Sequence, residues 1–258
     1  MLKVENVEVL GWEHAIRGMR NPKNSWAKSD SGTKCPYGKE KCCGECQQNF
    51  CIGPNDKQLM MSLRNAGTDH RKFMRFIDVY MDITAPLYWW KEFDTYKVGT
   101  VASSCSTMHK LTAKELTLDD FSHEDLIDYS LYACDESECM VLQGAPHIQC
   151  GGLQQLNMTI DVLNFYRQKY LETKYILSKN EKARQELAKK YWRQMIQLLP
   201  SSYNQLRTLK VSYEALANMY QARKNHKLDE WRIFCEWVEE LPYSELITGK
   251  EKGGGEGK

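Results

Sequence analysis

The chain has 258 residues, of which 42% are hydrophobic, so it is long enough to bury a substantial core. Its 35 basic and 34 acidic side chains give a net charge of +1, which provides no overall basic excess for attracting nucleic acid. No apolar run approaches the roughly 18 residues of a membrane span, and the first residues lack the pattern of a secretory signal. We therefore expect a cytoplasmic protein with no membrane span.

The N-terminal part predicts one strand and two helices. Residues 3–10 place Val4, Val7 and Val9 among charged residues, which is typical of a strand. Residues 12–19 predict a short helix that ends before Asn21-Pro22, and residues 56–65 predict an amphipathic helix. Between these two helices, residues 33–53 predict a cysteine-rich insertion loop.

The stretch from residue 73 to residue 110 combines a strand, an aromatic helix and a polar loop. Ile77, Val79, Met81 and Ile83 alternate with polar residues and predict a half-buried strand. Pro86 suits the first turn of a helix that continues to residue 93 and carries several aromatic side chains. The hydroxyl-rich residues after it predict a loop. This arrangement fits a ligand site, and it equally fits a core helix followed by a surface loop.

Helices dominate the rest of the chain. The sequence predicts helices over residues 153–177, 180–199, about 208–223 and about 226–240. The glycine-rich residues 249–258 predict a disordered tail. We therefore expect a single α+β, helix-rich domain over residues 1–248.

A cluster of thiols in the insertion loop suggests a structural metal site. Thiolates hold zinc tetrahedrally, and two of these cysteines have the C-x-x-C spacing of a zinc knuckle. The alternative is a loop of reduced, mobile cysteines. The candidate zinc ligands are Cys35, Cys42, Cys43, Cys46 and Cys51.

Several motifs follow one another in a recognisable order. Residues 82–88 (DITAPLY) join a strand to a helix, and His70 precedes them. Leu199-Pro200 precedes a segment that ends at Arg223, and His226, Glu230 and Arg232 come after it. Across most of residues 55–240 this order resembles the flavin-dependent thymidylate synthase family, in which a histidine near the position of His70 touches the flavin.

The resemblance implies a fold, a reaction and an assembly. It implies an α+β homotetramer that binds FAD and dUMP between its subunits. It also implies transfer of a methylene group from methylenetetrahydrofolate to dUMP, or an altered reaction on a related pyrimidine nucleotide, with NADPH as the source of hydride. In such a protein the flavin performs the redox chemistry, and the chain positions the reactants.

The family's signature, R-H-R-x-x-S-x-N-x-x-S-x-R-Y, is altered in this sequence. Its opening Arg-His-Arg falls on Thr95, Tyr96 and Lys97, and its closing Arg-Tyr falls on Thr107 and Met108. The intervening serine, asparagine and serine fall on Thr100, on Ala102 or Ser103, and on Cys105.

Glu214 falls where the family has an arginine that looks substrate-activating. Replacing a cation by an anion beside a phosphate turns an attraction of roughly 3 kcal/mol into a repulsion, at about 5 Å and an effective dielectric of about 20. Three alternatives follow: Glu214 points away from the ligand, another cation compensates for its charge, or the chain binds a different ligand. Lys210 precedes Glu214 by one turn of the expected helix, so an ordinary surface ion pair is a further alternative.

Candidate site residues follow from the resemblance and from side-chain chemistry. A nucleophilic cysteine needs a nearby cation or imidazole, which His109 supplies for Cys105 if this segment is helical, and a packed, inert thiol is the alternative. The candidate flavin-binding residues are His70, Thr95, Tyr96, Lys97 and His226. The candidate substrate-binding residues are Ser103, Ser104, Ser106, Arg207, Lys210 and Arg223.

A second hypothesis comes from another functional class. The lysines around the cysteine cluster suit phosphate contacts, so the chain could be a non-catalytic nucleotide- or nucleic-acid-binding protein with a zinc-stapled loop. Glu40 and Glu45 in the same loop oppose that hypothesis.

Overall fold

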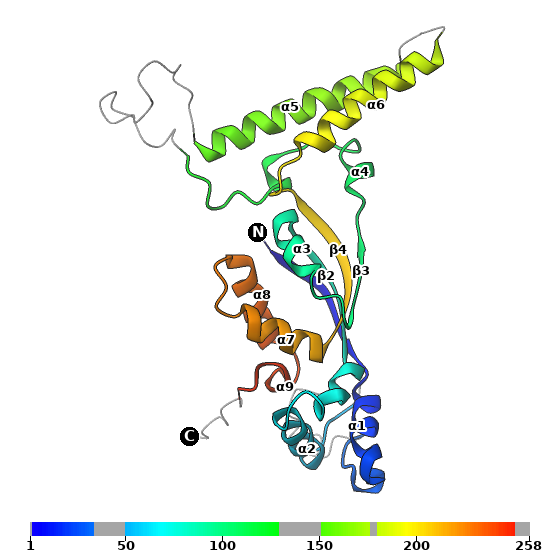
Figure 1. The fold of residues 1–258 in the computed structure, drawn as a ribbon, viewed down its shortest axis with the longest axis vertical. Helices are drawn as coiled ribbons and strands as arrows, with labels where there is room; N and C mark the ends of the chain where they lie inside the picture. The colour runs from blue at the N-terminus through cyan, green and yellow to red at the C-terminus, as the bar shows by residue number, and fades with distance from the viewer. Residues whose placement is uncertain (1, 34–49, 129–150, 176–179, 251–258) are drawn as a thin grey trace, which may run out of the picture. The chain divides into compact units, whose positions relative to one another are not determined.

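The computed structural model describes residues 2–33, 50–128, 151–175 and 180–250. The chain forms two compact units. One contains residues 85–88 and 104–205, and the other contains residues 2–84, 89–103 and 206–258. The strands are β1 (Lys3–Leu10), β2 (Asp78–Pro86), β3 (Thr100–Ser104) and β4 (Asn204–Ser212), and they form a sheet of order β1-β2-β4-β3 (Figure 1).

Strand β2 buries one face as its alternation predicts. Val79, Met81 and Ile83 are at most 1% exposed, whereas Tyr80 between them is 40% exposed. On the neighbouring β1, Val4 pairs with Ile83 and Val9 pairs with Val79. The two valines are five positions apart in the sequence, whereas their partners are four positions apart. A bulge between Glu5 and Glu8, with Asn6 at a φ of 52°, absorbs the extra residue.

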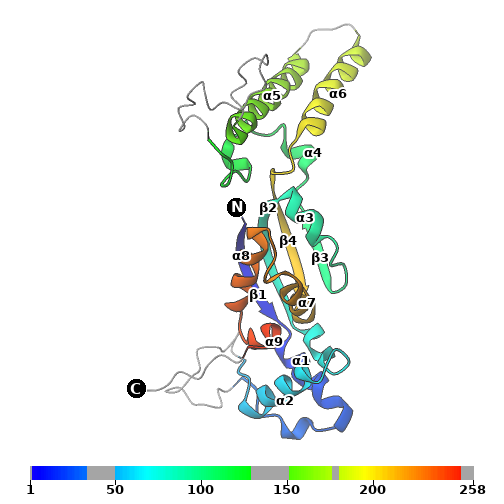
Figure 2. The same cartoon turned by 60° about the vertical axis from the view of Figure 1, so that its left-hand side comes forward.

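Helices cover the buried face of this sheet. Figures 1 and 2 show α7 (Tyr213–Arg223) and α8 (Asp229–Glu239) on the same side of the sheet, followed by α9 (Glu245–Thr248). The same unit holds α1 (Trp12–Arg20), α2 (Pro54–Asn65), the 3-10 helix η4 (Arg71–Phe76) and most of α3 (Leu87–Phe93). Helices over residues 12–19, 56–65 and 226–240 are confirmed to within a few residues at each end.

Three expectations about the elements near the candidate site are wrong. Pro86 is the last residue of β2 and not the first turn of the helix, which begins at Leu87. Residues 100–104, expected as a loop, form β3, an exposed edge strand. Residues 208–212, expected as helix, belong to β4. An edge strand pairs with only one neighbour and can be largely exposed and polar. Its sequence then resembles that of a surface loop.

The aromatic residues of α3 lie in the core. Trp89, Trp90 and Phe93 are at most 2% exposed, and the ring centroids of Trp89 and Trp231 are 4.8 Å apart. Phe93 and Trp231 are stacked at 6.4 Å with an interplanar angle of 14°. This helix therefore anchors α8 to the sheet, and the residues that follow Phe93 are the ones near the surface.

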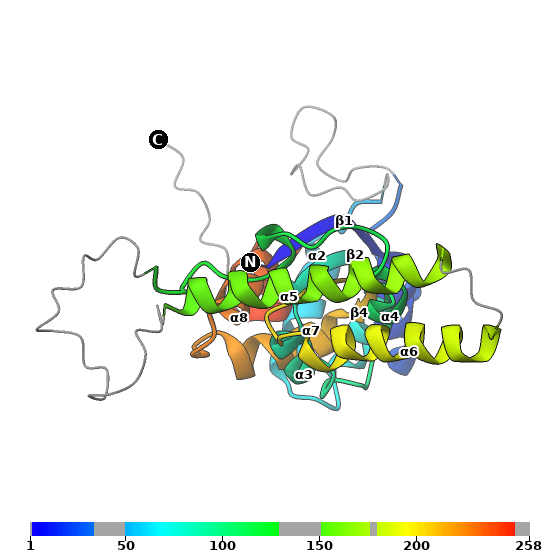
Figure 3. The same ribbon diagram turned by 90° about the horizontal axis from the view of Figure 1, so that it is seen from above.

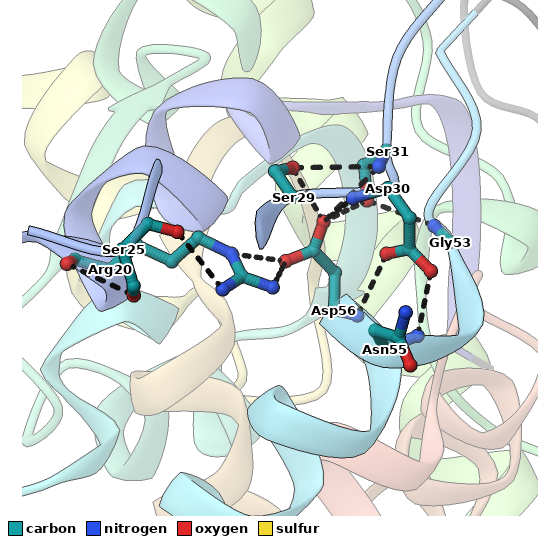
Figure 4. Close-up of polar contacts among 8 residues, drawn as sticks. All are labelled: Arg20, Ser25, Ser29, Asp30, Ser31, Gly53, Asn55 and Asp56. Carbon is teal, nitrogen blue, oxygen red and sulfur yellow. Dashed lines mark hydrogen bonds and ion pairs between the residues drawn. The ribbon is translucent and has the colours of Figure 1, made fainter. Parts of the chain in front are cut away.

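A buried ion pair joins α1 to α2 (Figure 4). Arg20 donates from Nε and Nη2 to Oδ1 of Asp56 at 2.6 Å, and these residues are 5% and 0% exposed. Oδ2 of Asp56 accepts from the hydroxyls of Ser29 and Ser31, each at 2.6 Å. Asp30 accepts from the backbone N–H groups of Asn55 and Asp56, the N-terminal donors of α2. Because its oxygens are so well satisfied, the Asp56 carboxylate is stabilised although it is buried.

The other unit is built on two long helices. Figure 3 shows α5 (Gly152–Glu172) and α6 (Glu181–Leu198) side by side, and the same unit contains α4 (Thr107–Lys110) and the 3-10 helix η5 (Leu118–Asp120). Asn180 caps α6 by accepting from the N–H of Ala183 at 3.1 Å. The core of this unit contains Leu111, Leu116, Phe121, Leu156, Ile160, Leu163 and Met195.

None of the helices in the described part of the chain is long and apolar enough to cross a membrane.

Candidate functional site

Two candidate residues, Arg223 and His226, meet at the carboxylate of Glu92, and a third, Tyr96, contacts Arg223. Nη1 of Arg223 donates to Oε2 of Glu92 at 2.8 Å, and Nε of Arg223 donates to the hydroxyl of Tyr96 at 2.9 Å. Nε1 of Trp231 donates to the same Glu92 oxygen at 2.9 Å, and Nε2 of His226 lies 3.5 Å from it. Residues of α3, α7 and α8 thus converge on a single oxygen atom. We call these five residues the Glu92 cluster.

The geometry assigns the tautomer of His226. The backbone N–H of Leu228 donates to Nδ1 of His226 at 3.2 Å, so Nδ1 acts as an acceptor. The neutral imidazole therefore carries its proton on Nε2, which faces Glu92.

The Arg223 guanidinium is held between aromatic rings. Its central carbon lies 4.9 Å from the ring centroid of Trp231 and 5.6 Å from that of Tyr96. Its side chain is 20% exposed, and Nη2 makes no hydrogen bond within the described residues. Arg223 therefore retains a donor that can bind an anionic group from outside the cluster.

A second charged group surrounds Glu214, which is 9% exposed. Arg75 holds both oxygens of Glu214, with Nη2 3.3 Å from Oε1 and Nε bonded to Oε2. Nε of Arg71 lies 3.8 Å from Oε1, and Nη2 of Arg71 donates to Oδ1 of Asn218 at 2.8 Å. Two cations thus flank one carboxylate. We call Arg71, Arg75, Glu214 and Asn218 the Glu214 cluster.

Glu214 pairs with cations on η4. Together Arg71, Arg75 and Glu214 carry a net charge of +1, from two guanidinium groups and one carboxylate. The expected pairing with Lys210 is wrong: Lys210 lies in β4, and its Nζ pairs with Oδ2 of Asp78 at 3.0 Å. His70 is exposed and directly precedes Arg71.

Arg207 and Lys210 lie on opposite faces of the sheet. Arg207 is on the helix-covered face, where its guanidinium stacks over Trp90 at 4.2 Å and Nη1 bonds Asp94 at 2.6 Å. Lys210 lies on the uncovered face, where Asp82 also accepts from Thr208 at 2.6 Å. The structure therefore does not bring these two candidates together.

The remaining candidates, in residues 95–106, are mostly exposed. Thr95 donates from Oγ1 to the backbone oxygen of Glu92 at 2.7 Å, and Lys97 follows at the surface. Gly99 has a φ of 78°, and a Cβ there would lie 2.8 Å from Oγ of Ser212. The exposed serines Ser103, Ser104 and Ser106 follow it.

Cys105 does not show the features of an activated nucleophile. It is a half-buried free cysteine, and its backbone oxygen accepts from Nε2 of Gln205 at 2.9 Å. His109 lies in α4, but no imidazole or cation within the described residues makes a hydrogen bond or ion pair with the thiol. A packed thiol accounts for this environment.

The proposed zinc site falls largely outside the described residues. Cys35, Cys42, Cys43 and Cys46 lie there, whereas Cys51 is 3% exposed and disulfide-bonded, so its sulfur is not an available thiolate. Within the described ranges, no three histidine, cysteine, aspartate or glutamate side chains are grouped as a metal site.

Comparisons with known proteins were made by sequence and by structure. No protein-family model matches the chain. No curated protein matches it either. Among solved structures, thymidylate synthase X from Helicobacter pylori with FAD and dUMP superposes with a TM-score of 0.55 and 18% identity, covering 96% of this chain and 98% of that one. This chain has the fold of the flavin-dependent thymidylate synthases.

A second structure supports the same assignment of fold. A UMP/dUMP methylase, PolB from Streptomyces cacaoi bound with 5-Br UMP, superposes with a TM-score of 0.52 and 12% identity, covering 96% of this chain and 94% of that one. The expected α+β, helix-rich flavin-dependent thymidylate synthase fold is confirmed.

Sequence reasoning missed Glu92, Trp231, Arg71 and Arg75. Arg71 and Arg75 adjoin His70 in a short basic run, which was a usable signal. Glu92 and Trp231 carried none, because the hydrogen bond that joins them links positions more than 100 residues apart.

Proposed function

We propose that this chain binds FAD and a uridine monophosphate, either dUMP or UMP, and methylates C5 of the pyrimidine. The observation that carries the proposal is the fold, which extends over almost the whole length of a thymidylate synthase that holds FAD and dUMP and of a methylase that holds a UMP analogue. The two charged clusters supply donors of the kind that such ligands need.

The residues present suit a phosphorylated, flat cofactor. Nε of Arg71 is buried and makes no hydrogen bond within the described part of the chain, since Oε1 of Glu214, its ion-pair partner, is 3.8 Å away. Arg75 is 58% exposed and adjoins it through Glu214. Guanidinium groups are preferred partners of phosphate, and we assign Arg71, Arg75, Asn218 and His70 to the flavin site. Thr95, Tyr96, Lys97 and His226 are the further candidates for that site.

Arg223 is the residue that we assign to the anionic part of the nucleotide. Its Nη2 is the unused donor of a guanidinium that Tyr96, Trp231 and Glu92 otherwise hold in place. The exposed hydroxyl of Ser103, which lies in the same unit, can add a neutral hydrogen bond. Arg207 is committed to Asp94, and Lys210 lies on the other face of the sheet, so we do not assign them.

The proposed reaction needs two further reactants. Methylenetetrahydrofolate would donate the methylene carbon and leave as tetrahydrofolate, C5 of the pyrimidine would lose its proton, and one hydride would reduce the methylene to a methyl group. FAD, when bound, would carry that hydride from NADPH, which is oxidised to NADP. By the resemblance, the active form is a homotetramer.

A titration with FAD tests the proposal. We expect the purified protein to bind about one FAD per subunit, measured by flavin absorbance and fluorescence. Arg71→Gln should weaken binding about tenfold, the effect of one charge-assisted hydrogen bond. Lys210→Gln is the matched control and should change the affinity less than about twofold. Absence of FAD binding, with or without dUMP, would contradict the proposal.

A further inference from the structure

One oxygen atom of Glu92 is the common acceptor for the groups that surround Arg223. Oε2 accepts from Arg223 Nη1 at 2.8 Å and from Trp231 Nε1 at 2.9 Å, and His226 Nε2 lies 3.5 Å away. Donors from α7 and α8 thus share one acceptor, and an imidazole from the segment between these helices lies beside it. A carboxylate oxygen can accept several hydrogen bonds at once, and charge-assisted bonds are the strongest of them.

These contacts restrict Arg223 more than an ordinary surface ion pair would. The Glu92 side chain is 33% exposed and that of Arg223 is 20% exposed, so water does not fully screen the pair. Tyr96 fixes Nε, Glu92 fixes Nη1, and Trp231 supports one face of the guanidinium plane. The N–H groups of Nη2 and the second N–H of Nη1 remain available, and their directions are set by the other contacts.

We infer that Glu92 is a positioning residue that orients Arg223 toward the anionic group of the nucleotide. It also keeps the Nε2–H of His226 directed into the cluster. Fixing a guanidinium before the ligand arrives removes the entropy that a free arginine would lose on binding. This inference rests on the proposed function, and it assigns Glu92 no contact with the substrate.

A double-mutant cycle tests the inference. Binding of dUMP and of deoxyuridine to the full chain with FAD is measured by calorimetry for wild type, Glu92→Ala, Arg223→Ala and the double variant. Each single change should weaken dUMP binding about tenfold. The double variant should bind no more weakly than Arg223→Ala, because Glu92 acts through Arg223. Deoxyuridine, which lacks the phosphate, should be affected less than about twofold.

Two further variants separate positioning from folding. Glu92→Gln keeps an oxygen acceptor for Arg223 and Trp231 and should recover part of the affinity. Glu236→Ala on α8 is the control for loss of an exposed carboxylate and should behave as wild type. The Nε–H resonance of Arg223 should be slow to exchange with solvent in wild type and in Glu92→Gln, but not in Glu92→Ala.

The outcomes distinguish the two proposals. If wild type binds no dUMP, the proposed function fails, and this inference fails with it. If wild type binds dUMP but the two single losses add in the double variant, the proposed function stands and the positioning role is wrong. Rapid exchange of the Arg223 Nε–H in wild type would also overturn it.

Discussion

Glu214 and Arg75 form a forked ion pair that joins the first turn of α7 to η4, with both carboxylate oxygens facing the guanidinium. By the resemblance, the position of Glu214 belongs to an arginine in related proteins. The structure therefore places the negative partner on α7 and the positive partners, Arg75 and Arg71, on η4.

Exchanging the two charges should restore a functional pair. Arg75→Glu places a second carboxylate beside Glu214, and Glu214→Arg places a third guanidinium beside Arg71 and Arg75. Each single change should lower the free energy of unfolding by about 1–3 kcal/mol, because it leaves a partly buried charge without its partner. The double exchange should return to within about 1 kcal/mol of wild type, measured by urea unfolding. If the double exchange instead lost the sum of the two single-variant losses in free energy of unfolding, Glu214 and Arg75 would not act as a specific pair.

The Arg20–Asp56 pair should be the most important ion pair for stability within the described residues. Asp56→Asn leaves the guanidinium of Arg20 buried beside a neutral amide, so we expect a loss of about 3–5 kcal/mol in urea unfolding. Glu172→Gln removes an exposed partner of Lys169 that water screens, so this variant should lose much less stability than Asp56→Asn. Similar losses in the two variants would contradict the account of Figure 4.

Asp56 should also contribute to sensitivity to acid. Burial alone would raise the pKa of Asp56, but hydrogen bonds from Ser29, Ser31 and Arg20 and the charge of Arg20 outweigh it, so the folded-state pKa is lowered. The carboxylate therefore contributes stability above its unfolded pKa of about 3.9, and this contribution is lost as pH falls from there through the folded pKa. The stability difference between wild type and Asp56→Asn should shrink over this range. A constant difference down to the folded pKa would contradict the assignment.

Gly99 should not tolerate a side chain. Its φ of 78° lies in the left-handed region, and a Cβ would lie 2.8 Å from Oγ of Ser212, the cap of α7. Gly99→Ala should therefore destabilise the chain by about 1–2 kcal/mol or more in thermal or urea unfolding. Gly32→Ala is the matched control, since nothing lies within 4 Å of its Cβ position, and it should be nearly neutral.

The sequence predicted elements with strong periodicity and missed those without it. The alternation of Val79, Met81 and Ile83 identified β2, and the spacing of Leu156, Ile160 and Leu163 identified α5. β3 was taken for a loop because Thr100–Ser104 is polar and exposed. β4 was taken for helix because its buried residues, Leu209 and Val211, continue directly into α7.

The candidate site was only partly predictable because its residues are joined by contacts between positions far apart in the sequence. The family resemblance located Tyr96, Arg223 and His226, and the structure brings them together. The carboxylate that joins them, Glu92, is one charged residue on a helix whose neighbours are core aromatics. Its role arises from long-range contacts, which no local pattern encodes. Lys210 shows the reverse error: it was chosen for its charge, and strand geometry turns it to the other face of the sheet.

The most direct test of the proposed function is analysis of the nucleotide product. The protein is incubated with FAD, NADPH, methylenetetrahydrofolate and either dUMP or UMP, and the nucleotides are separated by chromatography and identified by mass spectrometry. The account predicts a 5-methylated pyrimidine nucleotide from at least one substrate, with much less formed by Arg223→Ala. Unchanged dUMP and UMP, from protein shown to be folded and loaded with FAD, would contradict it.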